Sequence, residues 1–397
     1  MEATGELHRQ GLRLLQVTTT LDPSYGGPPV VLNQLTRGLI ELGHYVDVVT
    51  LDSPSAVWLR EIPGRVQALG PANGAYAHSR PLRDLLRASV SSYDAVIVHG
   101  IWRYHSRAVR KACLKASVPY FVFVHGALDP WFKERYPGKH VKKSLYWHLS
   151  EHRSLSNAKA VLFTQEKERD LARRSFTPYE LNEAVVPLGI SEPPGDADEQ
   201  RELFLSRYPE LRGKRLLLFL SRLHPKKGCD LLIEAFARVS NQDERLRLIM
   251  AGPDECAWES ELRDLSEKLG IADRVIWTGM LSGDLKWGAY RAADAFVLIS
   301  HSENFGIVIA EAMACALPVL TTDKVNIWRE IEQSGGALIE TDTIGGAESL
   351  LAMWLAKSEL DRGSMREQAR LCFVENFGGQ RAAVEFARFV NGAIQIK

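Results

Sequence analysis

Short apolar runs alternate with amphipathic stretches along the whole chain. The run LRLLQVTTT leads into a loop rich in glycine and proline, after which Val31, Leu35, Leu39 and Leu42 recur at helical spacing. The next stretch, YVDVVTL, alternates as a strand does. This order of strand, glycine loop, helix and strand predicts a βαβ unit.

The same pattern continues and then restarts after an interruption. Further strands are predicted at residues 95–98, 120–124 and 160–163. Residues 187–198 are rich in proline, glycine and acids, which is typical of a linker. Beyond it, strands are predicted at residues 215–220, 246–251, 275–278, 295–299 and 318–321, and helices at 230–239, 259–269 and 307–316.

Two successive βα sheets joined by a linker predict an α/β fold with two Rossmann-like domains. We place these domains at residues 1–190 and 191–376, and we expect residues 377–397 to form a helix that crosses back to the first domain. Open parallel sheets bind ligands beyond the carboxyl ends of their strands, so the two domains are expected to face each other across a deep cleft.

Composition narrows the classes of function. The 397 residues include 49 basic and 49 acidic ones, and this zero net charge argues against a nucleic-acid partner. The five cysteines are odd in number and form no CxxC pair, so a zinc site or a disulfide framework is not expected. Residues 1–10 lack the apolar core of a signal peptide, and no run of 18 apolar residues occurs. We therefore expect a cytoplasmic location.

A glycine loop and a basic loop each precede a predicted helix. Gly26 and Gly27 let the backbone approach a phosphate, and the helix that follows offers free N–H groups. An ordinary β-to-α turn would contain the same residues. Arg222 and Lys227 follow a strand in the second half and suit a diphosphate leaving group, whose developing charge they can neutralise. A solvated basic loop is the alternative.

Two acids enclose one glycine-containing loop in the second half. Glu303 follows a strand, and Glu311 lies eight residues later among small apolar side chains. A carboxylate in that setting must be paired or hydrogen-bonded, and vicinal sugar hydroxyls are good donors to it. The backbone N–H groups of Asn304, Phe305 and Gly306 at the helix start are further donors. A helix-start acid and a structural salt bridge are the alternatives, but two acids around one loop favour ligand binding.

Histidine and aromatic residues follow two strands of the first half. His125, followed by glycine, is positioned to donate to a substrate oxygen or to act as a base. Trp102 and Arg103 follow the preceding strand, and aromatic rings stack on the apolar faces of sugars. With Asp129, they are our candidates for contacts with an acceptor. A structural histidine and an ordinary aromatic loop are the alternatives.

Residues 131–152 combine basic and aromatic side chains in one predicted helix. The basic members are Lys133, Arg135, Lys139, His140, Lys142, Lys143, His148 and His152. Such a helix can lie on an anionic membrane surface, or it can bind a phosphorylated acceptor. A solvated helix whose aromatic rings pack inward is the alternative.

Taken together, these motifs resemble family 4 of the retaining glycosyltransferases of the GT-B type. The strongest motif is ENFGIVIAE at residues 303–311, followed by the similar text AMACALPVLTTD. The context SRLHPKKG matches the diphosphate-binding arginine and lysine of the family, and Gly26 with Gly27 matches its glycine loop. The resemblance extends from about Gly11 to the last predicted helix.

The resemblance implies a role for each matching residue. Arg222 and Lys227 would hold the diphosphate of the donor, Glu311 would accept hydrogen bonds from the ribose, and Glu303 would contact hydroxyls of the transferred sugar. The backbone N–H groups of residues 304–306 would reach sugar or phosphate oxygens. His125 would lie near the sugar and the leaving group.

The resemblance also implies how the donor is completed. The base would lie near Gly252 and the segment that ends at Leu281. Similar enzymes need no bound metal, because positive side chains and helix ends do its work. We therefore expect no cofactor other than the nucleotide sugar as co-substrate.

The function that follows is transfer of a hexose, with retention, from a nucleotide-diphosphate sugar to a saccharide or lipid-linked acceptor in polysaccharide biosynthesis. UDP-glucose is the first candidate donor; GDP-mannose, UDP-galactose and UDP-N-acetylglucosamine stay open. Peripheral contact with the inner face of the cell membrane is a further expectation. A sugar-nucleotide epimerase of the same fold and a non-catalytic nucleotide-sugar-binding protein are the alternatives.

Overall fold

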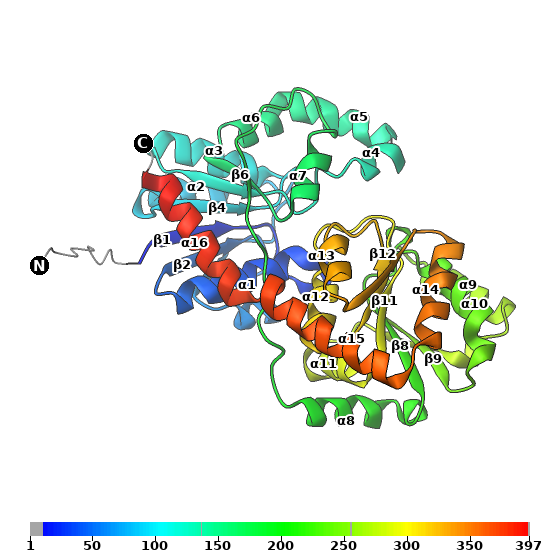
Figure 1. Ribbon diagram of the computed structural model, residues 1–397. Helices are drawn as coiled ribbons and strands as arrows, with labels where there is room; N and C mark the ends of the chain where they lie inside the picture. Colours follow the sequence, from blue (N-terminus) through cyan, green and yellow to red (C-terminus); the bar gives the residue numbers. More distant parts are fainter. Residues whose placement is uncertain (1–10, 136, 255, 396–397) are drawn as a thin grey trace, which may run out of the picture. The chain divides into compact units, whose positions relative to one another are not determined.

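The computed structural model describes residues 11–135, 137–254 and 256–395, so the residues that we judged for a signal peptide lie outside the described part. The chain divides into two compact units. One contains the chain up to Gly189 and again from Gly379 onward, and the other runs from Ile190 to Gly378. Each unit is built on an open sheet flanked by helices (Figure 1).

The first unit contains a seven-stranded parallel sheet in the order β3-β2-β1-β4-β5-β6-β7. Its strands are β1 (Arg13–Val17), β2 (Tyr45–Thr50), β3 (Arg65–Ala68), β4 (Ala95–His99), β5 (Tyr120–Phe123), β6 (Ala160–Phe163) and β7 (Glu183–Val185). The chain reverses its progress across the sheet between β1 and β4. The carboxyl ends of these two strands therefore form the switch point at which open α/β sheets bind ligands.

Helices cover both faces of this sheet. Successive residues of β1 point to opposite faces: Leu15 and Val17 enter a core that also holds residues of α2 (Arg80–Ser89) and α3 (Tyr104–Ala116). Gln16 points the other way, to α1 (Gly27–Glu41), against which α16 (Gly379–Gln395) packs. The start of α1 precedes the predicted apolar spacing, because two prolines fit the first helical turn, whose N–H groups need no partner.

Residues 131–152, which we predicted as one helix, are helical wherever the structure describes them. The described helical elements are α4 (Trp131–Arg135), α5 (Pro137–Tyr146), a π-helical turn (Trp147–Glu151) and α6 (His152–Ser156), and α7 (Glu166–Ala172) follows them.

The second unit contains a six-stranded parallel sheet in the order β10-β9-β8-β11-β12-β13. Its strands are β8 (Arg215–Leu220), β9 (Leu246–Ala251), β10 (Val275–Gly279), β11 (Ala295–Leu298), β12 (Val319–Thr322) and β13 (Ala337–Glu340). Here the switch point lies between β8 and β11. The loops that follow these two strands contain Arg222, Lys227 and Glu303.

Eight described helices accompany these strands, of which the three at about residues 230–239, 259–269 and 307–316 were predicted. They are α8 (Ala197–Arg207), α9 (Cys229–Val239), α10 (Glu259–Lys268), α11 (Gly283–Ala292), α12 (Ile307–Ala314), α13 (Trp328–Gln333), α14 (Ile344–Ala356) and α15 (Glu359–Cys372). The helix α8, which packs against α11, begins inside the predicted linker. The carboxylate of Asp196 caps it by accepting from the N–H groups of Asp198 and Glu199.

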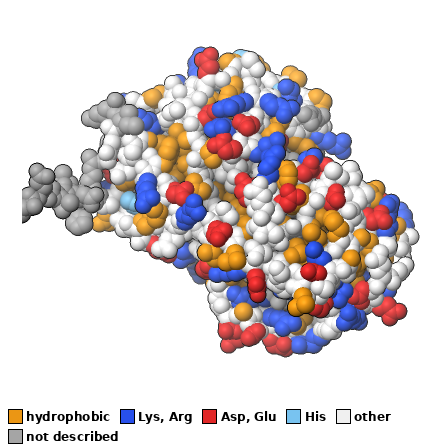
Figure 2. Space-filling model, in the orientation of Figure 1, with side chains coloured by type: hydrophobic (Ala, Val, Ile, Leu, Met, Phe, Trp, Pro, Cys, Tyr) orange, Lys and Arg blue, Asp and Glu red, His pale blue; other side chains and the backbone are white. Residues whose placement is uncertain are grey.

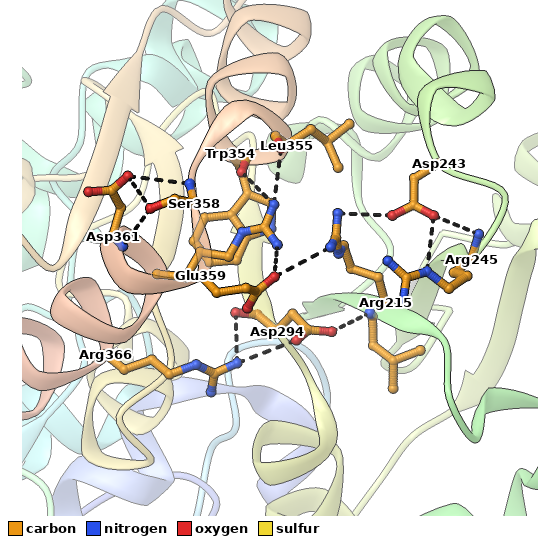
Figure 3. A network of polar contacts seen from close by, with 12 residues as sticks. Arg215, Asp243, Arg245, Asp294, Trp354, Leu355, Ser358, Glu359, Asp361 and Arg366 are labelled. Atoms are coloured by element: carbon orange, nitrogen blue, oxygen red, sulfur yellow. Dashed lines mark hydrogen bonds and ion pairs between the residues drawn. The ribbon is translucent and has the colours of Figure 1, made fainter.

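A polar network holds the amino ends of β8 and β11 to α15 (Figure 3). Arg215 at the start of β8 pairs with Asp243 at 2.9 Å and with Glu359 at 3.5 Å. Asp294, which precedes β11, accepts from the N–H of Leu216 at 2.8 Å. Ligands bind at the opposite ends of such strands, so this network serves the fold.

The visible surface mixes both signs of charge. Figure 2 shows lysine and arginine side chains interspersed with aspartate and glutamate over this face, in keeping with the equal numbers in the sequence. Among the described helices, none combines the length and the apolar character that crossing a membrane requires.

Candidate functional site

The loops after β8 and β11 lie side by side at the switch point of the second sheet. Gly228, with a φ of 61°, passes so close to β11 that a Cβ atom there would lie 2.0 Å from the carbonyl oxygen of Ile299. The N–H of His301 and the hydroxyl of Ser300 both donate to the carbonyl oxygen of Lys226, at 2.8 and 3.0 Å. These backbone contacts fix the positions from which the side chains of both loops extend.

Lys227 and Glu303 form an ion pair across this junction. Their side chains are only 8% and 18% exposed. Burial by itself would raise the pKa of the Glu303 carboxyl, but Lys227, Lys226 and the N–H of Asn304 outweigh it and leave that pKa below its usual value. Glu303 is therefore a carboxylate at neutral pH, ready to accept hydrogen bonds from hydroxyl groups.

The backbone around Glu303 is held on both sides. Its N–H donates to the carbonyl oxygen of Lys324 at 3.0 Å, and its own carbonyl oxygen accepts from the N–H of Asn326 at 3.0 Å. The side chain of Asn326 also donates to Asn304 at 3.2 Å. The loop after β11 is thus attached to the loop after β12, which makes it a rigid platform for a ligand.

The loop ends at α12, whose start was predicted to offer N–H groups. Gly306 precedes this helix with a φ of 70°. The ring of Phe305 is buried and meets Phe377 edge-on at 5.6 Å, so this residue offers its backbone rather than its side chain. The first N–H groups of a helix lack partners within it and carry a partial positive charge, which suits sugar or phosphate oxygens.

Glu311 lies on α12 and contacts α11 rather than the loops described above. Lys286 pairs with one carboxylate oxygen at 2.8 Å, and the hydroxyl of Tyr290 donates to the other at 3.0 Å. The carboxylate is 6% exposed. Glu311 therefore forms the structural salt bridge that we named as the alternative to ligand binding. A carboxylate has further lone pairs, which can still accept from ribose hydroxyls.

Arg222 and the predicted base site meet at the ends of β8, β9 and β10. Gly252 has a φ of 146°, and a Cβ atom there would lie 1.8 Å from the carbonyl oxygen of Ser221, so only glycine fits. Its N–H donates to the carbonyl oxygen of Gly279 at 2.9 Å. Arg222 is half-buried beside this contact, and Leu281 is buried just after β10. These predicted donor residues thus belong to adjacent strand ends.

The glycine loop of the first unit follows β1, as expected. The carboxylate of Asp22 accepts from the N–H of Ser24 and caps a short 3-10 turn at Pro23–Tyr25. Gly26 then turns the chain with a φ of 87°, and Gly27 is the first residue of α1. This places a helix start at the switch point of the first sheet.

His125 ends a chain of hydrogen-bonded side chains that crosses the first sheet. Its Nε2 lies 3.1 Å from Nδ1 of His99, whose Nε2 lies 2.7 Å from Oε1 of Gln16. The amide of Gln16 donates to Thr36 at 2.7 Å, and the hydroxyl of Thr36 donates to the carbonyl oxygen of Leu32 at 2.7 Å. Burial lowers the pKa of His125 to about 4, so this ring is neutral at pH 7.

The acceptor candidates occupy loops at the carboxyl ends of β4 and β5. Trp102 has a φ of 73°, and its indole N–H donates to the carbonyl oxygen of Ala127 at 3.3 Å. Arg103 is the N-cap residue of α3, and the carboxylate of Asp129 accepts from the N–H of Trp131 at 2.9 Å. The structure therefore attaches the Trp102 loop to the loop that contains His125.

Four functional candidates were not found from the sequence. Lys286 and Tyr290 stand four residues apart on α11, so they share one helix face, but the sequence did not show that this face meets α12. Gln16 and Thr36 are buried polar residues. The glutamine inside an apolar strand was a visible signal, because a buried amide must find partners.

Comparison with known proteins agrees with this arrangement. Residues 26–189 match the glycosyl transferase 4-like domain, and residues 201–371 match the glycosyl transferases group 1. The two matches together span most of the chain, which therefore belongs to the glycosyltransferases of this family. The predicted resemblance to a family of glycosyltransferases is confirmed.

Individual relatives differ in what their names state. The alpha-monoglucosyldiacylglycerol synthase of Streptococcus pneumoniae is 28% identical over 231 residues, 56% of this chain and 51% of its own length, so the chain spans about half of that relative. The GDP-mannose:cellobiosyl-diphosphopolyprenol alpha-mannosyltransferase of Xanthomonas campestris is 26% identical over 376 residues, 92% of this chain and 93% of its own.

Solved structures show the same fold. The Anabaena protein HepE, in complex with UDP-glucose, superposes with a TM-score of 0.76 at 16% identity, covering 96% of this chain and 100% of its own. The predicted fold class, two Rossmann-like domains of the GT-B type, is confirmed.

Proposed function

We propose that the protein transfers a hexosyl group, with retention of anomeric configuration, from a nucleotide-diphosphate sugar to a saccharide or lipid-linked acceptor. One observation carries this proposal: Lys227 and Glu303 pair across the switch point of the second sheet, beside the start of α12. A cation for phosphate and a carboxylate for hydroxyl groups thus stand together where open sheets bind their ligands.

The donor would occupy the second unit in a defined order. Its diphosphate would lie against Lys227 and Arg222, so that it competes with Glu303 for the ammonium group. Glu303 would then accept hydrogen bonds from the sugar, and Glu311 from the ribose. The base would lie between Gly252 and Leu281, at the ends of β9 and β10.

Retention would follow from attack on the face that the leaving group vacates. As the sugar bond breaks, negative charge grows on the departing phosphate, and fixed positive groups stabilise that charge more strongly than they stabilise the bound donor. Lys227, Arg222 and the start of α12 would supply this stabilisation. The departing phosphate would accept the proton of the acceptor hydroxyl, so no protein carboxylate needs to attack the sugar.

UDP-glucose remains our first candidate donor. HepE, which shares the fold, holds UDP-glucose in its structure, while the name of the Xanthomonas relative specifies GDP-mannose. The direct test is thermal denaturation with UDP, GDP and ADP, followed by their sugars, because a ligand of the folded form raises the melting temperature. No stabilisation by any of these nucleotides would contradict the proposal.

The acceptor would bind the first unit, and two features in and around α5 support an anionic, lipid-linked acceptor. A hollow beside the loop of Asp129 is lined by Ala127, Asp129, Lys133, Lys139, His140, Lys143, Ser175 and Phe176. In the same segment Val141, Leu145 and Leu149, spaced four residues apart, are 69%, 64% and 66% exposed. Exposed aliphatic residues flanked by lysines suit an anionic bilayer, so we propose peripheral docking at the cytoplasmic membrane face.

Two assays test the class of reaction and the membrane docking. Incubation with UDP-glucose alone separates a transferase from an epimerase, which would release a new sugar nucleotide. Sedimentation with phosphatidylglycerol vesicles at low salt tests docking, and Leu145→Ser should weaken the binding, whereas Leu203→Ser on the second unit should not. Equal sedimentation of both variants and the parent protein would contradict docking through α5.

A further inference from the structure

The chain of side chains that ends at His125 has a single consistent direction. The hydroxyl of Thr36 gives its proton to the carbonyl oxygen of Leu32 at 2.7 Å, so its oxygen faces Gln16 as an acceptor. The amide of Gln16 must therefore present Nε2 to Thr36 and Oε1 to His99. Turning the amide over would place two acceptors against each other inside the buried core.

The orientation of the Gln16 amide then determines the tautomer of both imidazole rings, His99 and His125. His99 must place its proton on Nε2, 2.7 Å from the amide oxygen, which leaves its Nδ1 as an acceptor. That Nδ1 lies 3.1 Å from Nε2 of His125, which must be the donor. His99 is buried and His125 is partly buried. Burial holds the pKa of His99 well below its usual value and lowers that of His125 to about 4, so neither ring takes a second proton near pH 7.

We infer that Thr36, Gln16 and His99 are positioning residues that lock His125 in one tautomer, so that His125 offers Nδ1 to a substrate as a hydrogen-bond acceptor. This inference rests on the proposed function, and it decides between the two roles that the sequence left open for His125. A neutral ring with a free lone pair receives a sugar hydroxyl. It does not act as a cation toward the leaving phosphate.

Neighbouring groups keep the ring in place without competing for its nitrogens. The rings of Phe123 and His99 stack on His125 with centroids 5.4 and 5.3 Å away. The buried carboxylate of Glu168 on α7 accepts from the N–H of Gly126 at 2.7 Å. His105 on α3 donates to the carbonyl oxygens of His99 and Gly100, which holds the end of β4. Within the described residues, His99 is the ring's one polar side-chain partner.

A matched pair of substitutions on α1 tests the relay at a distance from the substrate. Thr36→Val has the shape of threonine without the hydroxyl, so the amide of Gln16 can turn over and the tautomer of His99 is released. Thr36→Ser keeps the hydroxyl and the direction of the relay. We expect Thr36→Val to lower kcat about tenfold, the size expected for one misaligned hydrogen bond in the transition state, with KM for the donor unchanged. Thr36→Ser should keep the parent kcat.

Nitrogen-15 NMR of the histidine rings gives a readout that is independent of turnover. In the parent protein and in Thr36→Ser, Nδ1 of His125 should show the shift of an unprotonated nitrogen, and in Thr36→Val this signal should move or broaden. A protonated Nδ1 in the parent protein would overturn the inference, as would equal kcat values for the valine and serine variants. If UDP-glucose and the other sugar nucleotides gave no transfer, the proposed function would fail, while the NMR result would still decide the tautomer.

Discussion

Lys227 and Glu303, 76 residues apart in the chain, form an ion pair between the ends of two adjacent strands. Both side chains are largely buried, and a buried pair is costly to break because the remaining charge keeps its burial without its partner. The depressed pKa of Glu303 means that the unfolded chain binds this proton more readily. The pair therefore stabilises the fold above the unfolded pKa of about 4.3, and this stabilisation is lost as the pH falls below it.

Replacing Glu303 should separate turnover from nucleotide binding. Glu303→Gln keeps the shape of the side chain but removes the charge that receives sugar hydroxyls, so we expect kcat to fall about a hundredfold. Affinity for UDP, which lacks the sugar, should stay within about threefold of the parent value, as measured by titration calorimetry. Unchanged turnover in this variant would refute the role assigned to Glu303.

Replacing Lys227, the ion-pair partner of Glu303, provides the control for Glu303→Gln. Lys227→Met leaves the Glu303 carboxylate buried without its main cation, so its pKa should rise and the free energy of unfolding should fall by about 3 kcal/mol at pH 7. UDP affinity should now fall by at least tenfold, because the diphosphate loses a cation. Equal effects of Lys227→Met and Glu303→Gln on UDP binding would contradict the division of roles.

Substitutions of Glu311 and Tyr290 should separate an effect on UDP binding from an effect on stability. The hydroxyl of Tyr290 donates to Glu311 at 3.0 Å, so Tyr290→Phe removes one contact and leaves the carboxylate paired with Lys286. We expect Tyr290→Phe to cost about 1 kcal/mol of stability with little change in UDP affinity. Glu311→Gln should weaken UDP binding about tenfold, because the charge-assisted bonds to ribose become neutral ones. If uridine diphosphate bound both variants with parent affinity, Glu311 would be a structural residue.

The sequence predicted the interior strands well and the edge strands poorly. Strands such as β8 and β11 are buried on both faces and appear as continuous apolar runs. Three of the four edge strands, β3, β7 and β13, are short and largely half-buried, and their runs RVQA, EAV and ALIE were not predicted; the fourth, β10, was predicted. Short, polar edge strands protect a sheet from aggregation. Because they contain few apolar residues, the hydrophobic pattern of the sequence does not predict them.

The sequence predicted those parts of the candidate site that lie in loops directly after neighbouring strands. Loops after neighbouring parallel strands must meet, so a motif after β8 and another after β11 could be expected to lie together, as Lys227 and Glu303 do. Side chains on helices were not predictable in this way. The partners of Glu311 depend on how α11 packs against α12, and the partners of His125 depend on an amide in β1 that we read only as part of an apolar run.

Three histidines with depressed pKa values should make the first unit sensitive to acid. Burial lowers the pKa of His105 and His125 to about 4 and that of His99 well below its usual value. Below about pH 6.5 the unfolded chain binds protons that the folded chain does not, so the free energy of unfolding falls as the pH falls from about 6.5 towards 4. Each histidine contributes about 1.4 kcal/mol per pH unit in this window.

Substitution of one of these rings tests that dependence. His105→Gln keeps an N–H donor for the carbonyl oxygens of His99 and Gly100 but removes the titration. Urea denaturation at pH 5, 6 and 7 should therefore show a pH slope that is smaller by about one proton than in the parent protein. Identical slopes would mean that His105 is already protonated in the folded protein at pH 5.

Arg362 should matter for stability and not for catalysis. Its guanidinium donates to the carbonyl oxygens of Trp354 and Leu355 at 3.2 and 3.0 Å and pairs with Glu359, so it completes the last turn of α14. Its side chain is 7% exposed. Arg362→Met leaves the carbonyl oxygen of Leu355 without this donor, whereas that of Trp354 keeps the N–H of Lys357 at 3.2 Å. We expect a loss of about 1–3 kcal/mol in the free energy of unfolding.

Arg366, one turn further along α15, is the matched control. It contacts Asp294 only at 3.4–3.5 Å, and its side chain is 39% exposed, so Arg366→Met should cost less than about 1 kcal/mol. Because both residues lie at the amino ends of the strands, UDP affinity and kcat at a temperature below the transition should match the parent values in both variants. A lower kcat in a folded Arg362→Met protein would show that this network influences the site at the opposite edge of the sheet. If Arg362→Met and Arg366→Met lowered the free energy of unfolding equally, the carbonyl groups of α14 would have found other donors.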